Sequence, residues 1–530
     1  MNGSAIAAGW RSIAALLVVV AAGHLTLFPR VADLDGFYHI GHTAAYLEGS
    51  FLDTSMPWAT QSVIRDAGAD LWWGFHVLLA PFALFDDPAV GIRLAAVALT
   101  LTLGLAVFRI LARHGVPGAG WWAAGFLVAV PNVFFRFLMV RPHVLSLAAS
   151  LALVSVMARG RRWHVALLSG AIAWLHLSLF WVVPGLVTAY ALTRMPIAIG
   201  SELDPDDRSV PIGAAFGAAV LGLVAGWLLR PHPIATMELL NVQLVRLFAQ
   251  RASEEPMLFA AELLPIGLPE LGRTAWPFLL VWLAALLVTL RHVTRGLVAR
   301  LGQERATVLV VATLVSLAFV GLAVVSARRA MVQWMAFGFL TLPLAWTFLL
   351  HDRARRLARA PLAVLLAAHL AWGSWRHSLN VSQVAFDGSS LAGAAAFLAT
   401  NSEPGDVVFH ARWDNFGPLL ARNRTNHYLG GMDPIFQFAH DARTYWEFFY
   451  MSADVNVEWT CDAFPCSAGV VTDTHRVIRE HFGARWVLVE PRRNPRLALE
   501  LLNDPRYALA LETQREAVFE VLPDTASVGR

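Results

Sequence analysis

Lysine is absent from this chain of 530 residues, so all 41 of its basic residues are arginine. The arginine-codon preference of a GC-rich bacterial genome explains this absence without any functional cause. The basic residues outnumber the 38 acidic ones by only three, which gives a net charge of +3. This balance does not indicate a nucleic-acid partner, and the positions of the arginines are more informative than their number.

Cysteine is nearly absent, since only Cys461 and Cys466 occur, in the run Cys-Asp-Ala-Phe-Pro-Cys. Two cysteines this close can form a disulfide, a redox pair or half of a metal site. No other cysteine is present to complete a zinc site, which favours a disulfide. A disulfide would place this part of the chain in an oxidising compartment.

Charged residues are scarce, at 15% of the chain, whereas hydrophobic residues make up 57%. A soluble protein of this size has too little interior to bury so many apolar side chains. The composition therefore indicates an integral membrane protein. The first apolar run, from Arg11 to Phe28, lacks a cleavage site of small residues and predicts an uncleaved first helix.

Long apolar runs recur at the length needed to cross about 30 Å of hydrocarbon. They predict a mainly α-helical fold with about eleven transmembrane helices. The stretch from Leu71 to Phe85 is too short to span and is interrupted by Pro81, so it predicts an interfacial or re-entrant helix. The predicted spans are 11–28, 89–111, 119–134, 141–157, 163–178, 180–193, 211–229, 276–291, 306–325, 330–350 and 360–376.

The arginines indicate the orientation in the membrane. With the N-terminus inside, the short inner loops contain about fifteen arginines, as the positive-inside rule requires. An odd number of spans then places the C-terminal tail outside, where a Cys461–Cys466 disulfide can form. We therefore expect a multi-pass protein of the bacterial cytoplasmic (inner) membrane with a periplasmic or extracellular tail.

Two domains are predicted. Residues 1–377 form a polytopic transmembrane domain with long outer loops at about 29–87 and 230–275, and residues 378–530 form a small outer α/β domain. The second loop contains an amphipathic pattern from Met237 to Gln250. Within the tail, the pattern predicts a helix at Leu391 to Thr400, strands at Asp406 to His410 and Arg485 to Glu490, and a hairpin at Tyr507 to Leu522.

Two carboxylates, Asp33 and Asp35, follow the first predicted helix, and His39 and His42 come soon after them. If a helix starts near Gly36, Asp35 is a plausible N-cap and the two histidines share one helix face. The group is either a capped interfacial helix or an acid/base or metal-binding site at the membrane surface.

Six histidines fall at or near the predicted outer face, where polar side chains usually face a cavity. We expect at least three of them to line one site, which could bind a phosphate or a divalent metal. They are His39, His42, His76, His143, His176 and His232.

The run Asp35-Gly36-Phe37-Tyr38-His39 resembles the GT-C superfamily of integral-membrane glycosyltransferases, and the run from Pro57 to His76 looks like that of uncharacterised bacterial members. Some oligosaccharyltransferase catalytic subunits have Asp followed by aromatic-Tyr-His at this place, and protein mannosyltransferases are similar in layout. The resemblance covers roughly residues 10–350 in layout. It implies a polyprenyl-phosphate-linked sugar donor, interfacial helices, and an essential acidic residue in the first outer loop.

The chain departs from this superfamily in one outer turn. Many members have a second acidic residue between the third and fourth spans, but Arg136 to His143 contains none, which argues against a two-acid metal site. Arg141 and His143 could instead hold a phosphate. Arg328 and Arg329 lie in a short outer turn of the kind that binds the donor phosphate in related enzymes; the alternative is snorkelling to lipid headgroups.

The resemblance implies a hexosyl- or pentosyltransferase that moves a sugar from a polyprenyl-phosphate donor to a glycan, lipid or protein acceptor. No cofactor is required by the sequence beyond a possible divalent metal. The alternatives are a lipid-linked glycan polymerase or ligase, a non-catalytic envelope assembly protein, and a lipid transporter, which would need broken helices and mid-membrane charges. The predicted catalytic residues are Asp35 and Asp33, and the predicted substrate-binding residues are His39, His42, His76, Arg141, His143, Arg328 and Arg329.

Overall fold

The computed structural model describes residues 3–194, 208–253, 255, 257–293 and 296–523. The chain divides into two compact units. The first unit consists of Met1–Asp33, Arg93–Arg230 and Ala261–Phe386. The second unit consists of Leu34–Ile92, Pro231–Ala260 and Asp387–Arg530.

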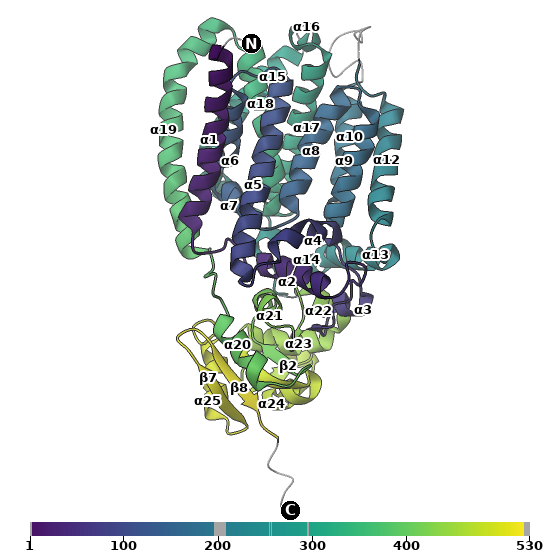
Figure 1. Ribbon diagram of the computed structural model, residues 1–530, viewed down its shortest axis with the longest axis vertical. Coiled ribbons are helices and arrows are strands. Elements are labelled where there is room, and N and C mark those ends of the chain that lie inside the picture. Colours follow the sequence, from purple (N-terminus) through teal and green to yellow (C-terminus); the bar gives the residue numbers. More distant parts are fainter. Residues whose placement is uncertain (1–2, 195–207, 254, 256, 294–295, 524–530) are drawn as a thin grey trace, which may run out of the picture. The chain divides into compact units, whose positions relative to one another are not determined.

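The first unit is a bundle of apolar helices, and Figure 1 shows the long ones running side by side. Every predicted span overlaps at least one of these helices. Their bounds are α1 (Gly3–Leu27), α5 (Pro88–Arg113), α6 (Ala119–Val128), α7 (Pro131–Phe137), α8 (His143–Ala158), α9 (Arg162–Leu175), α10 (Val182–Leu192), α12 (Ile212–Leu228), α15 (Leu268–Val293), α16 (Leu297–Leu301), α17 (Gln303–Val325), α18 (Met331–Leu344) and α19 (Asp352–Gln383).

The bundle is that of a membrane protein. Among the described residues, five helices are long and apolar enough to cross a membrane, or up to six if a bent pair counts as one span. Other parts of the bundle, such as Ile13–Leu27 and Ala119–Val128, are apolar but shorter. The predicted total of eleven spans and their orientation therefore stay predictions.

Helices α9 and α12 approach each other closely enough for their backbones to touch. A Cβ atom added to Gly226 would lie 2.2 Å from the carbonyl oxygen of Gly170, and one added to Gly222 would lie 2.1 Å from that of Ala166. Glycines four residues apart on one helix face are typical of this close packing in membranes, where dispersion contacts drive helix association. The run from Gly222 to Gly226 therefore fixes the position of α12 against α9.

The second unit contains the helices of the two long predicted loops. The stretch from Leu71 to Phe85 forms α4 (Trp73–Leu79) and a 3₁₀ turn (Ala80–Phe82). At 1.5 Å per residue α4 is about 10 Å long, which is too short to span a bilayer. Met237 to Gln250 is helical throughout, as predicted, in α13 (Pro233–Asn241), a π-helical turn (Val242–Arg246) and α14 (Leu247–Ala252). The other helices of these loops are α2 (Asp35–Glu48) and α3 (Val63–Ala67).

A mixed six-stranded sheet forms the centre of the second unit, with the order β1-β3-β2-β6-β8-β7. The outermost strand β1 comes from the first long loop and pairs in parallel with β3, so the sheet is not built from the C-terminal tail alone. The predicted hairpin is formed by β7 and β8, which pair antiparallel. The strands are β1 (Ala59–Thr60), β2 (Val407–His410), β3 (His427–Leu429), β6 (Ala484–Val489), β7 (Tyr507–Glu512) and β8 (Ala517–Val521).

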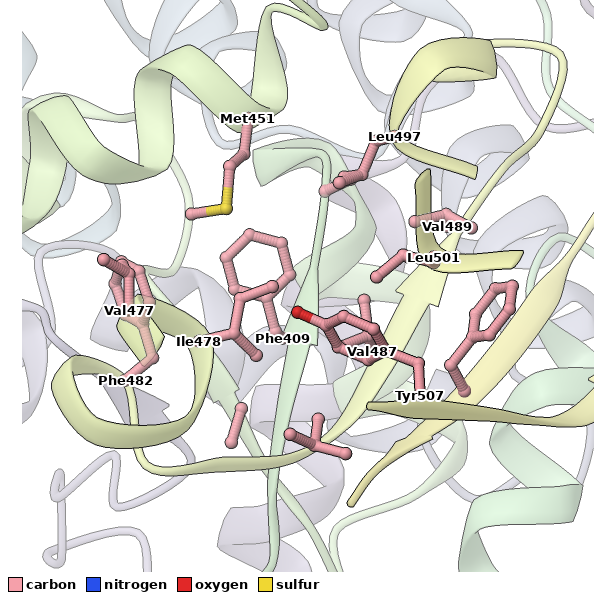
Figure 2. Packing of buried hydrophobic residues seen from close by; sticks show 14 of the residues in the cluster. Phe409, Met451, Val477, Ile478, Phe482, Val487, Val489, Leu497, Leu501 and Tyr507 are labelled. Carbon is pink, nitrogen blue, oxygen red and sulfur yellow. The ribbon is translucent and has the colours of Figure 1, made fainter. Parts of the chain in front are cut away.

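The hydrophobic core of this unit lies against the central strands (Figure 2). Val487 and Val489 alternate along β6 and are both fully buried, as the two-residue period of a strand requires. Phe409 of β2 packs with Met451 and Leu497 in the same cluster. The helices of the tail are α20 (Ala392–Asn401), α21 (Phe416–Arg422), α22 (Ile435–His440), α23 (Ala442–Ser452), α24 (Thr474–Arg476) and α25 (Pro495–Asn503).

Cys461 and Cys466 are joined by a disulfide at the end of a small antiparallel pair, β4 (Trp459–Cys461) and β5 (Val471–Asp473). The two compact units do not coincide with the two predicted domains, which meet at residue 377. The reason is that the long predicted loops belong to the same compact unit as the tail. The predicted boundary between membrane and outer domains stays a prediction.

Candidate functional site

Polar side chains gather where several helices of the first unit end. We call Asp33, Arg136, Arg141 and Glu262 the arginine–carboxylate cluster. Arg141 binds both carboxylates, pairing through Nε with Asp33 and through Nη1 with Glu262 Oε1 at 3.0 Å. Arg136 pairs with the other oxygen of Glu262. These four side chains are between 8% and 22% exposed, so the cluster is shielded but open to a ligand.

Backbone hydrogen bonds hold the segments of the cluster in place. Val31 and Phe386 exchange two bonds of 2.9 Å, which tie the segment before Asp33 to the end of α19. Glu262 lies in a 3₁₀ turn, Ala261–Leu263, next to Leu264, whose carbonyl accepts the N–H of Arg328 at 2.7 Å. These contacts bring segments far apart in the sequence to one end of the bundle.

Further cationic and imidazole groups surround the cluster. His143, at the start of α8, interacts electrostatically with Arg136, Arg141 and Glu262. Arg329 interacts with Glu262 and with His176, which follows α9. His143 Nε2 and His176 Nδ1 are buried and have no hydrogen-bond partner among the residues that the structure describes. Such a nitrogen costs about 1–3 kcal/mol when it stays unpaired.

Arg230 adds a fourth guanidinium near His176. Its Nη2 donates to the carbonyls of Ala173 and Trp174 at 2.6 and 2.8 Å, so it closes the C-terminal turn of α9 and is only 3% exposed. Arg136, Arg141, Arg230 and Arg329 together exceed the two carboxylates by two positive charges. This excess suits a dianionic ligand such as a phosphate monoester.

Arg328 lies in a different environment from Arg329. Its Nη1 pairs with Glu270 Oε1 at 3.0 Å, and the two side chains are 33% and 37% exposed. Exposed pairs of this kind contribute little, about 0–1 kcal/mol. Of the two predicted arginines, therefore, it is Arg329 that lies beside the cluster.

The cluster does not fit a divalent metal. Asp33 and Glu262 are the two acids of this cluster, but a guanidinium lies between them instead of an open position. Burial opposes ionisation of Glu262, yet Arg136 and Arg141 outweigh it and hold its pKa well below the ordinary value. Both carboxylates are thus committed to arginine, and no step is assigned to a metal here.

A second cluster lies in the second unit, and we call His39, His42, Asp70 and His76 the histidine–aspartate cluster. His39 and His42 are one turn apart on α2, as predicted, and His76 is on α4. His76 Nδ1 lies 2.6 Å from Asp70 Oδ2, and His76 Nε2 lies 2.8 Å from His39 Nδ1. All four residues are at most 2% exposed.

Neighbouring groups fix the orientation of this cluster. Asp70 accepts hydrogen bonds from the Tyr46 hydroxyl at 2.9 Å and from the Trp72 N–H at 2.8 Å. Burial works against the charge on Asp70, but His76, His42 and the hydrogen bond from the Trp72 N–H lower its pKa below the ordinary range. Burial lowers the pKa of His42 to about 3, so its imidazole is neutral at physiological pH. His42 Nδ1 faces the Tyr38 hydroxyl at 3.1 Å.

Several predictions about individual residues need correction or refinement. Asp35 is the first residue of α2, not its N-cap, because Leu34 occupies that position without a side-chain bond. Asp35 lies in the second unit and Asp33 in the first. Of the six histidines, His39, His42 and His76 come together, whereas His232 interacts with Asp53 instead.

Sequence reasoning missed two acidic residues. Glu262 supplies the second carboxylate, although the expected turn between the third and fourth spans has none. It is the single acid in the otherwise apolar run from Met257 to Leu268, which was the available signal. Asp70 likewise precedes the aromatic pair Trp72-Trp73, and an acid beside buried aromatics is a costly placement that needs partners.

No protein-family model matches the chain, and no curated protein matches it by sequence. Its structure is similar to two solved structures of ArnT from Cupriavidus metallidurans. The apo state matches with a TM-score of 0.54 and 14% identity over 97% of this chain and 98% of ArnT. The state bound to undecaprenyl phosphate matches with a TM-score of 0.55 and 13% identity over 96% and 98%.

A third solved structure is also similar to this chain. This is the Archaeoglobus fulgidus oligosaccharyltransferase tethered with an acceptor peptide. It matches with a TM-score of 0.52 and 12% identity over 96% of this chain and 74% of that one. At these identities the likeness establishes the fold and leaves the chemistry to the residues of this chain.

Proposed function

Because the chain has the fold of the GT-C glycosyltransferases, we propose that it transfers a sugar from a polyprenyl-phosphate-linked donor to an acceptor at the outer face of the cytoplasmic membrane. The proposal is carried by one observation: Arg136, Arg141 and Arg329 gather with buried imidazole nitrogens where apolar helices end. A lipid phosphate needs such a place, since its tail lies among helices and its charge must meet cations.

The arginines would act on the leaving group. In the transfer, an acceptor hydroxyl oxygen attacks the anomeric carbon, and the bond from this carbon to the phosphate oxygen breaks. The electron pair remains on the departing polyprenyl phosphate, whose charge therefore grows toward the transition state. Fixed guanidinium groups stabilise this developing charge more than they stabilise the ground state, which lowers the barrier.

A carboxylate would take the proton of the acceptor hydroxyl. We assign this base to Asp35, with Asp33 as the alternative. Asp33 is already bound by Arg141, so its main role is to hold that guanidinium in position. Direct attack by the acceptor in a single displacement inverts the configuration at the anomeric carbon.

The donor assignment rests on the undecaprenyl phosphate bound in the ArnT structure of the same fold. A donor of this class releases its own polyprenyl phosphate, whichever sugar it carries. The proposed donor is therefore a sugar on a polyprenyl phosphate, and the acceptor is a glycan, a lipid or a protein. The predicted topology would put the site and the tail outside the cytoplasm.

The experiment uses the full chain in membranes, supplied with an extract of polyprenyl-phosphate-linked sugars and envelope acceptors from the host. Release of undecaprenyl phosphate is followed by mass spectrometry. We expect Asp35→Asn to abolish release and leave the amount of folded protein unchanged. Glu48→Gln, at the other end of α2, is the matched control and should retain activity.

The outcomes separate the competing functions. Normal release in both Asp35→Asn and Asp33→Asn would refute the mechanism. Binding of undecaprenyl phosphate without any release in the wild type would favour a lipid transporter. An envelope assembly protein would tolerate loss of both carboxylates in a complementation test, and a polymerase or ligase would yield products of increasing length.

A further inference from the structure

The histidine–aspartate cluster has a feature that the proposed transfer does not use. His42, Asp70 and His76 each present one possible ligand atom, and these atoms all lie within 4.8 Å of one another. All three residues are buried. His42 Nε2 is also buried and has no hydrogen-bond partner in the described part of the chain. We propose that His42, Asp70 and His76 form a zinc site.

The donor set matches the chemistry of zinc. Two imidazoles and one carboxylate form a common three-ligand set for Zn²⁺, and they leave one tetrahedral position for a water molecule. When His42 Nδ1 donates to the Tyr38 hydroxyl, its Nε2 keeps a lone pair that is available as a ligand. Binding of zinc would thus give His42 Nε2 the partner that it lacks among the described residues.

The surrounding hydrogen bonds are those expected around metal ligands. Tyr46 and the Trp72 N–H hold the Asp70 carboxylate in place. His39 Nδ1 lies 2.8 Å from His76 Nε2, so it can accept the proton of that nitrogen when His76 binds through Nδ1. Such outer partners fix the tautomer and the ring orientation of a ligating histidine.

The movement that zinc requires of His76 and Asp70 is small. His76 Nδ1 and Asp70 Oδ2 are 2.6 Å apart and are joined by a hydrogen bond. Two tetrahedral ligands at about 2.0–2.1 Å from zinc lie about 3.3 Å apart, so this contact must open by about 0.7 Å. Zinc would replace the proton of this hydrogen bond, which is released to solvent.

The test measures metal content and does not depend on transfer activity, so it can fail or succeed independently of the proposed function. The full chain is purified in detergent after expression with added zinc, and its zinc is measured by mass spectrometry. We expect about one zinc per chain in the wild type. We expect His42→Gln and Asp70→Asn to lose it.

A matched control is available in His410, which is buried in the same unit. His410 belongs to no three-residue ligand group among the described residues. His410→Gln should therefore retain the zinc. Tyr46→Phe, which removes one bond to Asp70, should weaken zinc binding about tenfold.

A second test uses the wild type alone, so its result does not depend on whether a variant folds. Wild type stripped with a chelator should regain zinc and thermal stability when Zn²⁺ is added, and Mg²⁺ should have no effect. The proposal is overturned if stripped wild type takes up no zinc. Equal zinc contents in folded His42→Gln and His410→Gln would also overturn it, and the cluster would then be a hydrogen-bond network only.

Discussion

Arg328 and Arg329 are adjacent in the sequence, yet the structure assigns them different surroundings, and this difference can be tested directly. Arg329 interacts with Glu262 and His176 beside the arginine–carboxylate cluster. Arg328 pairs with Glu270 in an exposed position. We expect Arg329→Gln to weaken binding of undecaprenyl phosphate strongly and Arg328→Gln to leave it nearly unchanged.

The size of the effect follows from the kind of contact. A hydrogen bond to a charged group contributes about 1.5–3 kcal/mol. Since about 1.4 kcal/mol corresponds to a factor of ten, loss of the Arg329 contact should raise the Kd roughly 10- to 150-fold. Arg328 is screened by Glu270 and by solvent, so its loss should change the Kd by less than about threefold.

The assay is a titration of the purified full chain with undecaprenyl phosphate, followed by tryptophan fluorescence and repeated at two salt concentrations. Both variants should show the circular dichroism of the wild type, which excludes unfolding as the cause. Wild-type binding should weaken at higher salt because the contact is ionic. Wild-type affinity in Arg329→Gln, or an equal loss in both variants, would refute the placement of the phosphate at this cluster.

Three other features give predictions. Gly226→Val should lower the free energy of unfolding in detergent by about 1–3 kcal/mol, because its Cβ would meet a backbone oxygen. Gly217→Val, which has open space around it, is the control, and an equal loss in both variants would contradict the close packing of α9 and α12. Thiol labelling in cells should leave Cys461 and Cys466 unmodified until a reductant is added, and immediate labelling would contradict an outer tail. Hydrogen bonds from a backbone N–H and from an arginine lower the pKa of Asp387 to about 2. The lowered pKa stabilises the folded state above about pH 4, and this stabilisation is lost as the pH falls through 2. Asp387→Asn should reduce the pH-dependent part of the free energy of unfolding by about 1 kcal/mol, a small value because the side chain is half-exposed.

The sequence predicted the local elements of the tail well, since their signals are short-range. The alternation of apolar residues along β6 and the hairpin of β7 and β8 follow directly from residue order. It did not predict β1, because a strand of two residues has no period and forms only where β3 offers it a partner.

The candidate site was predicted in part. The ends of the predicted spans indicated Asp33, Arg141, His143 and both Arg328 and Arg329. The structure brings these together except for Arg328. Glu262 was not predicted because the resemblance implies a second acid in the turn before α8, whereas Glu262 lies in the turn Ala261–Leu263. A carboxylate can reach the same arginine from any neighbouring loop, and the sequence does not show which loop lies there.

Composition and periodicity alone determined that this chain is a membrane protein, because apolar runs of this length have no other stable place. They also determined where the apolar helices and the strands β2, β6, β7 and β8 form, since those signals lie within a few residues. Only the tertiary structure decided that Arg329 rather than Arg328 lies at the cluster, and that Glu262 shares Arg141 with Asp33. It likewise decided that His42, Asp70 and His76 converge. These contacts depend on distances between segments that are far apart in the chain. Such distances are fixed only when the helices pack, so residue order alone does not show them.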